Sequence, residues 1–156
     1  MARAMLADHV LFLDGEAIIV DKPSGLPVDP PRDGSLSLEN HLQALMFGFK
    51  RWPTAVHRLD RDTSGCLLVA RTRPALRMLH ALLREGEVEK HYTALVAGRW
   101  RLGRKTIDAP VLTNARQGGE RVVRVHAEGK IAISVFAPQQ HFHELATRMD
   151  VAIQTG

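Results

Sequence analysis

The nine residues from His57 to Gly65 (HRLDRDTSG), called the central loop below, constrain this chain more than any other stretch. Two aspartates and two arginines fall within five of its positions, between the short segment 54–56 and the apolar run Cys66–Ala70, which is typical of a buried strand. A charged loop between two strands is a common place for functional side chains on a rigid support. Asp62 can bond back to the local backbone and Gly65 can adopt a positive φ, so a turn is expected. On this pattern alone, a solvated turn with self-neutralising charges is an equally good interpretation.

The segments before the central loop predict a β-hairpin and a helix. Val10–Leu13 and Ala17–Val20 are apolar runs joined by Asp-Gly-Glu, a sequence that favours a tight turn between paired strands. Ser37 is a good helix N-cap, and Glu39 in the first turn suits the helix dipole. The apolar face of this helix is expected to consist of Leu38, Leu42, Leu45, Met46 and Phe49, which recur at helical spacing.

The segments after the central loop predict a second helix and then strands. Thr72 suits its N-cap, Pro74 its first turn and Gly86 its C-terminal end. A flexible connection is expected at residues 116–120. Strands are expected over residues 88–96, 121–126, 131–136 and 145–154, with 121–126 and 131–136 paired as a hairpin around Glu128-Gly129-Lys130.

The fold class follows from the order of these elements. Strands dominate, two helices lie between them, and no regular βαβ series is present, so the sequence predicts an α+β fold around a mixed, mostly antiparallel sheet with flanking helices. A length of 156 residues suits one domain with a real core. We therefore expect a single domain over residues 1–156.

Composition narrows the class of partner and compartment. The net charge is +4 and the sequence pI is about 9.7, which favours a polyanionic partner such as nucleic acid. Cys66 is the only cysteine, so no internal disulfide can form, and its apolar neighbours predict a buried, inert thiol. We find no signal peptide and no apolar stretch long enough to span a membrane, so we expect a cytoplasmic protein.

Three blocks of sequence resemble one family. The central loop resembles the H-R-L-D-x-x-T-S-G motif of the RluA-like family of RNA pseudouridine synthases. Residues 18–28 (IIVDKPSGLPV) resemble the family's early strand followed by K-P-x-G-x-x-V. Residues 88–98 (VEKHYTALVAG) resemble its K-x-Y-x-A-L-V-x-G strand. The blocks occur in the family's order and spacing, and the resemblance implies the pseudouridine synthase fold, with the active site in a cleft across the middle of its sheet.

The resemblance implies a role for several residues. Asp60 matches the catalytic aspartate, and a carboxylate can attack, or stabilise, the cationic sugar that develops when a glycosidic bond breaks. Tyr92 is implied to stack on the uracil and to serve as, or lie near, the acceptor of the ring-carbon proton. Arg58 is implied to fill the gap left by the flipped uridine, because a planar guanidinium can stack there and meet phosphate. Substrate contacts are also implied for His57 and Arg61.

The implied activity is the isomerisation of uridine to pseudouridine in transfer or ribosomal RNA, a reaction that needs no metal, redox partner or other cofactor. Nothing indicates a protein partner, and we expect a monomer. The alternatives for the site residues are structural. Arg58 could be a surface arginine paired with Asp60 or Asp62, and Tyr92 a half-buried strand residue beside Ala94 and Val96. A catalytically inactive RNA-binding remnant is the alternative for the whole chain.

Two other site types are rejected on spacing. The segment His141-Phe142-His143-Glu144 fits no standard zinc pattern and has no cysteine pair beside it. The sequence Asp62-Thr63-Ser64-Gly65 lacks the glycine that aspartic proteases carry directly after Asp-Thr or Asp-Ser. Lys22, in the K-P block, is expected to support the fold or contact phosphate rather than perform chemistry.

The sequence departs from the family pattern at its end. In the family, a strand ending in T-G continues into R-x-H-Q-I-R, whereas this sequence ends at Thr155-Gly156. The arginine of that motif pairs with the catalytic aspartate in the family. We therefore expect a catalytic domain that is truncated at its C-terminus, with doubtful activity as given, and with no separate N-terminal RNA-binding module.

Overall fold

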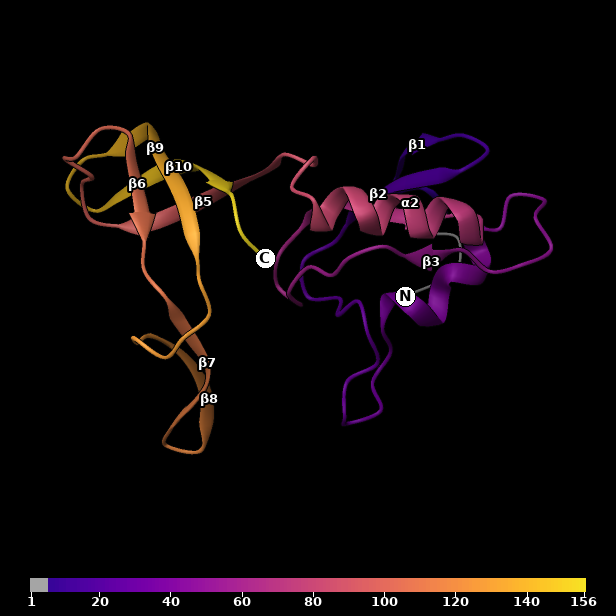
Figure 1. Cartoon of the computed structure of the whole chain (residues 1–156), viewed down its shortest axis with the longest axis horizontal. Helices are drawn as coiled ribbons and strands as arrows, with labels where there is room; N and C mark the ends of the chain where they lie inside the picture. The colour runs from indigo at the N-terminus through magenta and orange to yellow at the C-terminus, as the bar shows by residue number, and fades with distance from the viewer. Residues whose placement is uncertain (1–5) are drawn as a thin grey trace. The chain divides into compact units, whose positions relative to one another are not determined.

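The computed structural model describes residues 6–156, which form two compact units, one up to Glu85 and one from Gly86 to Gly156 (Figure 1). Each unit is described by itself. The prediction of a single catalytic domain over 1–156 stays a prediction. None of the helices among residues 6–156 is both long and apolar enough to cross a membrane.

The first unit is built on a four-stranded antiparallel sheet in the order β1-β2-β4-β3. The Asp-Gly turn between β1 and β2 forms as predicted, because Asp14 Oδ1 accepts hydrogen bonds from the N–H groups of Glu16 and Ala17, both at 2.8 Å. The strands are β1 (Val10–Leu13), β2 (Ala17–Lys22), β3 (Thr54–Ala55) and β4 (Gly65–Ala70).

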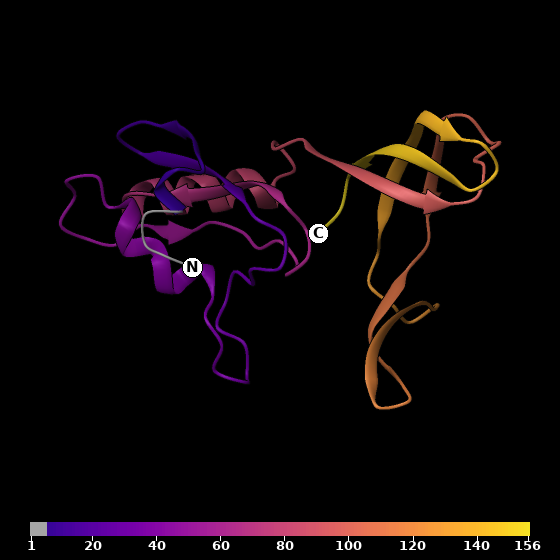
Figure 2. The same ribbon diagram turned by 180° about the vertical axis from the view of Figure 1, so that it is seen from behind.

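The helix α2 (Arg73–Arg84) lies along one face of this sheet (Figures 1 and 2). Its N-cap is Thr72, as predicted, and the Thr72 hydroxyl accepts a hydrogen bond from Ala75 N–H at 3.2 Å. Gly86 follows the helix with a φ of +76°, which suits glycine at a helix end. The packing joins α2 to β4 through a cluster of Val56, Ala70 and Ala75 with Leu68, Leu76, Leu79 and Leu83.

The segment after Ser37 is helical, but it forms a 3-10 helix, η1 (Leu38–Leu45), that ends before Met46. Asn40 Oδ1 accepts a hydrogen bond from Ser37 N–H at 2.8 Å, which closes the first turn. The expected apolar face is partly correct. Leu38, Leu42 and Leu45 are buried, whereas Phe49 lies outside the helix and is 37% exposed.

The second unit contains a four-stranded antiparallel sheet in the order β5-β10-β9-β6 and a two-stranded ribbon, β7-β8. Met149 and Val151 of β10 are buried on one face, as the alternating pattern predicted. The strands are β5 (Lys90–Ala97), β6 (Lys105–Asp108), β7 (Val111–Gln117), β8 (Glu120–Val125), β9 (Ile133–Phe142) and β10 (Ala146–Ile153).

Two sequence predictions are wrong here. The segment 121–126 does not pair with 131–136. It belongs to β8, which pairs with β7 across the turn at Gly118 and Gly119, both with positive φ. The expected flexible connection at 116–120 is therefore the end of a hairpin, and β9 pairs with β10 and β6 instead. Glycines with φ of +58° and +86° supply the turn that no neighbouring residue could adopt cheaply.

Cys66 also differs from its prediction, because its thiol is exposed rather than buried. It lies on β4 next to Leu67, which is fully buried. Successive side chains of a strand point to opposite faces, so an apolar run does not place every member in the core. The sheet of the first unit thus buries one face of β4 more completely than the other at this position.

Candidate active site

Lys22, the last residue of β2, connects the K-P block to the central loop. Its side chain is fully buried. Its ammonium Nζ donates hydrogen bonds to the carbonyl oxygens of Pro23 at 3.0 Å, Leu26 at 2.7 Å and Arg61 at 2.9 Å. The first two belong to the K-P block and the third to the central loop. One buried ammonium therefore fixes two segments that are far apart in the sequence, which confirms the expectation that Lys22 supports the fold.

Further bonds hold the central loop against the K-P block. The Arg61 carbonyl also accepts a hydrogen bond from Gly25 N–H at 2.8 Å, and Ser24 Oγ donates to the Asp62 carbonyl at 2.7 Å. The side chain of Leu59 is buried, so the loop carries an apolar anchor of its own. The backbone on both sides of position 60 is thus fixed by contacts outside the loop.

The charge of Lys22 is balanced by the loop it holds. Burial lowers the pKa of the Lys22 ammonium below its usual value, because the charged form loses hydration. The negative charges of Asp62 and Asp60 act in the opposite direction and raise that pKa. The two carboxylates of the central loop therefore help to keep the buried ammonium charged.

Asp60 occupies the exposed tip of this fixed backbone. A turn forms at this point, in which Thr63 N–H donates to the Asp60 carbonyl at 3.1 Å. Within residues 6–156 the Asp60 carboxylate makes no hydrogen bond or ion pair, although it lies close enough to Lys22 to influence its pKa. The carboxylate is therefore presented to solvent on a support that holds its position.

The second carboxylate of the loop is engaged. Asp62 forms a two-pronged ion pair with its neighbour, with Arg61 Nε to Oδ1 at 3.0 Å and Nη2 to Oδ2 at 3.1 Å. This pair lowers the pKa of Asp62 and raises that of Arg61, with the direct hydrogen bonds as the largest cause. The expected bond from Asp62 back to the backbone is not formed. Gly65 does adopt the predicted positive φ, at +111°.

Arg58 has an acidic partner outside the central loop. Its Nη1 lies 2.9 Å from Asp29 Oδ2, and its side chain is 77% exposed. The structural alternative drawn from sequence paired Arg58 with Asp60 or Asp62, and the observed partner is neither. Asp29 lies in the Pro-rich segment after the K-P block, and no local pattern connects it to position 58. An exposed pair of this kind is held weakly and can open when another anion competes.

His57 extends the pairing of β3 with β4. Its Nε2 accepts a hydrogen bond from Leu68 N–H at 3.0 Å, next to the backbone bond from Val56 N–H to the Leu68 carbonyl at 2.9 Å. An accepting Nε2 carries no proton. On the α2 side, His80 Nε2 lies 2.9 Å from the Val56 carbonyl oxygen. Substrate binding by His57 stays a prediction, and its ring is engaged with the sheet.

Tyr92 belongs to the second unit, where it lies on β5 opposite Val151 of β10. Exposure alternates along β5, with Tyr92, Ala94 and Val96 half-buried on one face and His91, Thr93, Leu95 and Ala97 exposed on the other. The half-buried face is the one expected from the sequence. The central loop lies in the first unit.

The histidine-rich turn between β9 and β10 serves the fold of the second unit. Arg101 Nη2 donates to Glu144 Oε2 at 2.7 Å, and His141 Nδ1 lies 3.3 Å from Thr147 Oγ1. The buried Thr147 hydroxyl in turn donates to the Gly98 carbonyl at 2.9 Å. Among the described residues, no group of three or more His, Cys, Asp or Glu side chains is arranged to hold a metal ion.

Comparison with known proteins identifies the family. Residues 16–156 match the family model of RNA pseudouridylate synthases. The chain belongs to this family. It is 51% identical over 131 residues to an uncharacterized RNA pseudouridine synthase of Zymomonas mobilis, and 45% identical over 139 residues to ribosomal large subunit pseudouridine synthase C of Escherichia coli. The RluA-like resemblance seen in the sequence is thereby confirmed.

The structure of the family member agrees with solved folds. The chain matches human RNA pseudouridylate synthase domain containing 4 with a TM-score of 0.81 at 21% identity, covering 99% of this chain and 62% of that one. The predicted α+β pseudouridine synthase fold is therefore confirmed. The matched segments comprise 83% and 89% of this chain, but only 59% of the Zymomonas relative and 43% of the Escherichia relative.

Proposed function

We propose that this protein is an RNA pseudouridine synthase that isomerises uridine to pseudouridine, and that ribosomal RNA is its substrate. Membership in the family supports the reaction. The name of the Escherichia relative, a ribosomal large subunit synthase at 45% identity, favours ribosomal over transfer RNA. The observation that carries the proposal is the central loop, which holds an exposed carboxylate on a backbone fixed by Lys22.

Asp60 is the catalytic carboxylate in this proposal. The reaction breaks the bond between C1′ of the ribose and N1 of uracil, turns the base, and joins C1′ to C5 with loss of the C5 proton. A carboxylate beside C1′ attacks it or stabilises the positive charge that develops there. Position matters as much as charge, because a misplaced group loses much of its effect. The bonds to the Arg61 carbonyl on one side and the burial of Leu59 on the other supply that position.

Arg58 and Tyr92 act on the base. Removing a uridine from its stack costs a few kcal/mol, and a guanidinium that fills the gap offsets part of it. The exposed pair of Arg58 with Asp29 suits this role, because the guanidinium is held near the loop until RNA phosphate replaces the carboxylate. Tyr92 supplies an aromatic face to the uracil and a phenol near its C5 proton. His57 and Arg61 support the RNA backbone around the site.

Asp60→Asn tests the assignment. We expect turnover to fall at least a thousandfold, while affinity for RNA stays within a few-fold, because the basic surface supplies most of the binding. The measurement is tritium release from RNA labelled at C5 of uridine, with a filter-binding assay alongside. Substantial turnover by the Asn variant would remove Asp60 from the mechanism. RNA binding without turnover by the unaltered protein would favour the inactive remnant.

Arg58→Ala, measured in the same two assays, separates base flipping from plain charge. We expect turnover to fall more than affinity, because the side chain acts when the base is out of the stack. A lost phosphate contact would instead weaken binding evenly and lower the salt slope by about one. A change in salt slope alone would contradict the flipping role.

A further inference from the structure

A hollow of about 580 Å³ lies in the first unit, at the opposite end of β3 and β4 from the central loop. Thr54 begins β3 and pairs with Ala70, the last residue of β4, and both line the hollow. The central loop meets β4 at Gly65, five residues earlier. At about 3.3 Å per residue, the two ends of β4 are roughly 17 Å apart. The hollow is therefore separate from the candidate active site.

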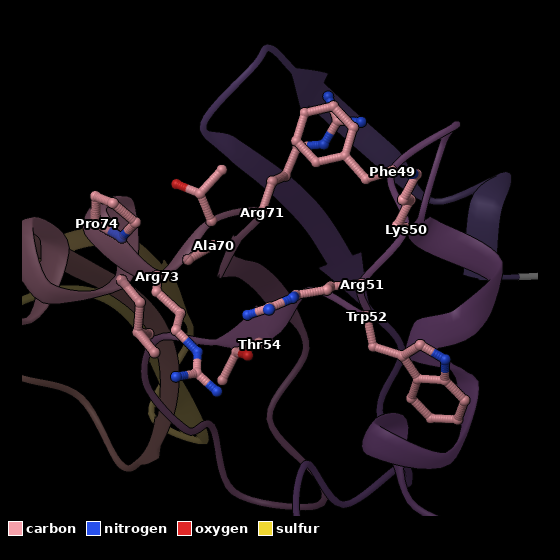
Figure 3. Close-up of a pocket in the computed structure, with 11 residues that line it drawn as sticks. Phe49, Lys50, Arg51, Trp52, Thr54, Ala70, Arg71, Arg73 and Pro74 are labelled. Atoms are coloured by element: carbon pink, nitrogen blue, oxygen red, sulfur yellow. The ribbon is translucent and has the colours of Figure 1, made fainter.

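The hollow is lined by cations and aromatic rings. Its lining includes Lys50, Arg51, Arg71 and Arg73 together with Phe49 and Trp52, and no acidic side chain of the described residues belongs to it. Figure 3 shows Arg51 and Arg73 extending from opposite sides toward the space above Thr54. Guanidinium groups that converge without a carboxylate repel one another, and a bound anion relieves that repulsion.

One of the four cations builds the wall, which leaves the other three available. Arg71 donates to the carbonyl oxygens of Met46 at 3.2 Å and Phe47 at 3.1 Å, and its guanidinium lies 3.7 Å from the centre of the Phe49 ring. These contacts fix the segment that carries the rest of the site. Within the part of the chain that the structure describes, Lys50, Arg51 and Arg73 form no ion pair, and all three are exposed.

We propose that this hollow is a second RNA-binding site, which takes a single-stranded segment away from the uridine that reacts. Arg51 and Arg73 would hold a phosphate, since the guanidinium fork matches its oxygens. Trp52, 51% exposed at the rim, would stack on a neighbouring base. The volume falls in the range of sites for small ligands and suits a nucleotide. The choice of RNA over other polyanions rests on the proposed function.

The first test is equilibrium binding of a fluorescent twelve-residue oligouridylate. Arg51→Ala/Arg73→Ala is compared with Arg77→Ala, which removes an exposed arginine of α2 outside the hollow. We expect the double variant to bind at least tenfold more weakly, with a salt slope lowered by about two, one for each lost phosphate contact. An affinity and slope equal to those of Arg77→Ala after correction for one charge would overturn the proposal.

The second test asks whether bases are read. We expect Trp52→Ala to bind the oligouridylate about fivefold or more weakly with an unchanged salt slope, and Trp52→Phe to restore most of the loss. Binding of heparin, which has no bases, should not respond to Trp52→Ala. An equal loss for heparin, or tighter binding of polyglutamate that Trp52→Ala weakens equally, would replace RNA by an acidic partner and overturn the assignment. Because affinity is measured without turnover, a failure of Asp60→Asn to stop catalysis leaves this result unaffected.

Discussion

The central loop and the β7-β8 hairpin are both charged segments, but they hold their shape in different ways. The central loop has no strand partner over most of its length, and its backbone is fixed by a buried ammonium, a buried leucine and two bonds from the K-P block. The β7-β8 hairpin pairs with itself from Val111–Val125 to Gln117–Glu120. Val123 and Val125 of β8 are 63% and 71% exposed. One segment depends on distant residues and the other on its own ladder.

This difference decides what each segment can do. A loop fixed by distant contacts can present a side chain such as Asp60 at a set position without burying it. A hairpin held by its own ladder, with little burial on either face, can open or bend at low cost. We therefore place the positioning of the reaction in the central loop and expect the hairpin to tolerate change, except where its base meets another segment.

Lys22→Met is expected to have the largest effect on stability. The variant keeps the length of the side chain but removes the donor, so the carbonyl oxygens of Pro23, Leu26 and Arg61 lose a partner in a buried site. Each buried acceptor left unpaired costs roughly 1–3 kcal/mol, and we expect the free energy of unfolding of the first unit to fall by about 3 kcal/mol or more. Hydrogen exchange measured by mass spectrometry resolves the two units, with Gly25 and Thr63 as reporter amides.

Lys90→Met is the matched control for that variant. Lys90 Nζ also donates to two carbonyls, those of Thr155 and Gly156, but the side chain is only half-buried on β5. We expect a smaller loss that is confined to the second unit. Equal losses for the two variants, or no change in the exchange of Gly25, would contradict the role of Lys22 as the anchor of the central loop.

The elements that bury a face were predictable from sequence. The β1-β2 hairpin, β4, α2 with its Thr72 cap, and β10 all follow from apolar spacing and turn residues, because a buried face allows one register only. The β7-β8 pairing was missed for the same reason. Neither strand buries a full face, so hydrophobic spacing did not distinguish a partner at 111–117 from one at 131–136.

The candidate site was predictable in its residues but not in its contacts. The motif placed Asp60, Arg58 and Tyr92, whereas no local pattern pointed to Asp29 as the partner of Arg58 or to the Arg61 carbonyl as the partner of Lys22. These contacts join segments that are about 30 to 40 residues apart. They depend on how β2 and β4 pair, which side-chain types alone do not determine.

Gly129→Ala is expected to have an intermediate effect, at the one place where the hairpin depends on another segment. A Cβ at Gly129 would lie 2.5 Å from the Val111 carbonyl carbon, closer than atoms can approach. Val111 and Lys130 exchange backbone hydrogen bonds at 2.9 and 2.8 Å beside this contact. Relieving the clash should cost about 1–3 kcal/mol and speed the exchange of both amides. Gly15→Ala, which meets nothing within 4 Å, is the control, and an equal response from it would show that the hairpin base is not a tertiary contact.

Arg61→Ala is expected to have the smallest effect, because it removes a side chain of the central loop and keeps the carbonyl that anchors it. The Arg61 guanidinium lowers the pKa of Asp62 below its ordinary value of 3.8, chiefly through their hydrogen bonds. A carboxyl whose pKa is lowered on folding adds stability above its unfolded pKa, and that contribution is lost as the pH falls through the folded value. Arg61→Ala should therefore raise the pKa of Asp62 toward 3.8 in an NMR titration. It should also lower stability slightly near neutral pH and leave it unchanged well below pH 3.8, where Asp62 is protonated in both proteins. The exposed position of the pair limits its contribution. A loss of stability at neutral pH as large as that of Lys22→Met would mean that the side chains of the loop, and not its carbonyl anchor, hold Asp60 in place.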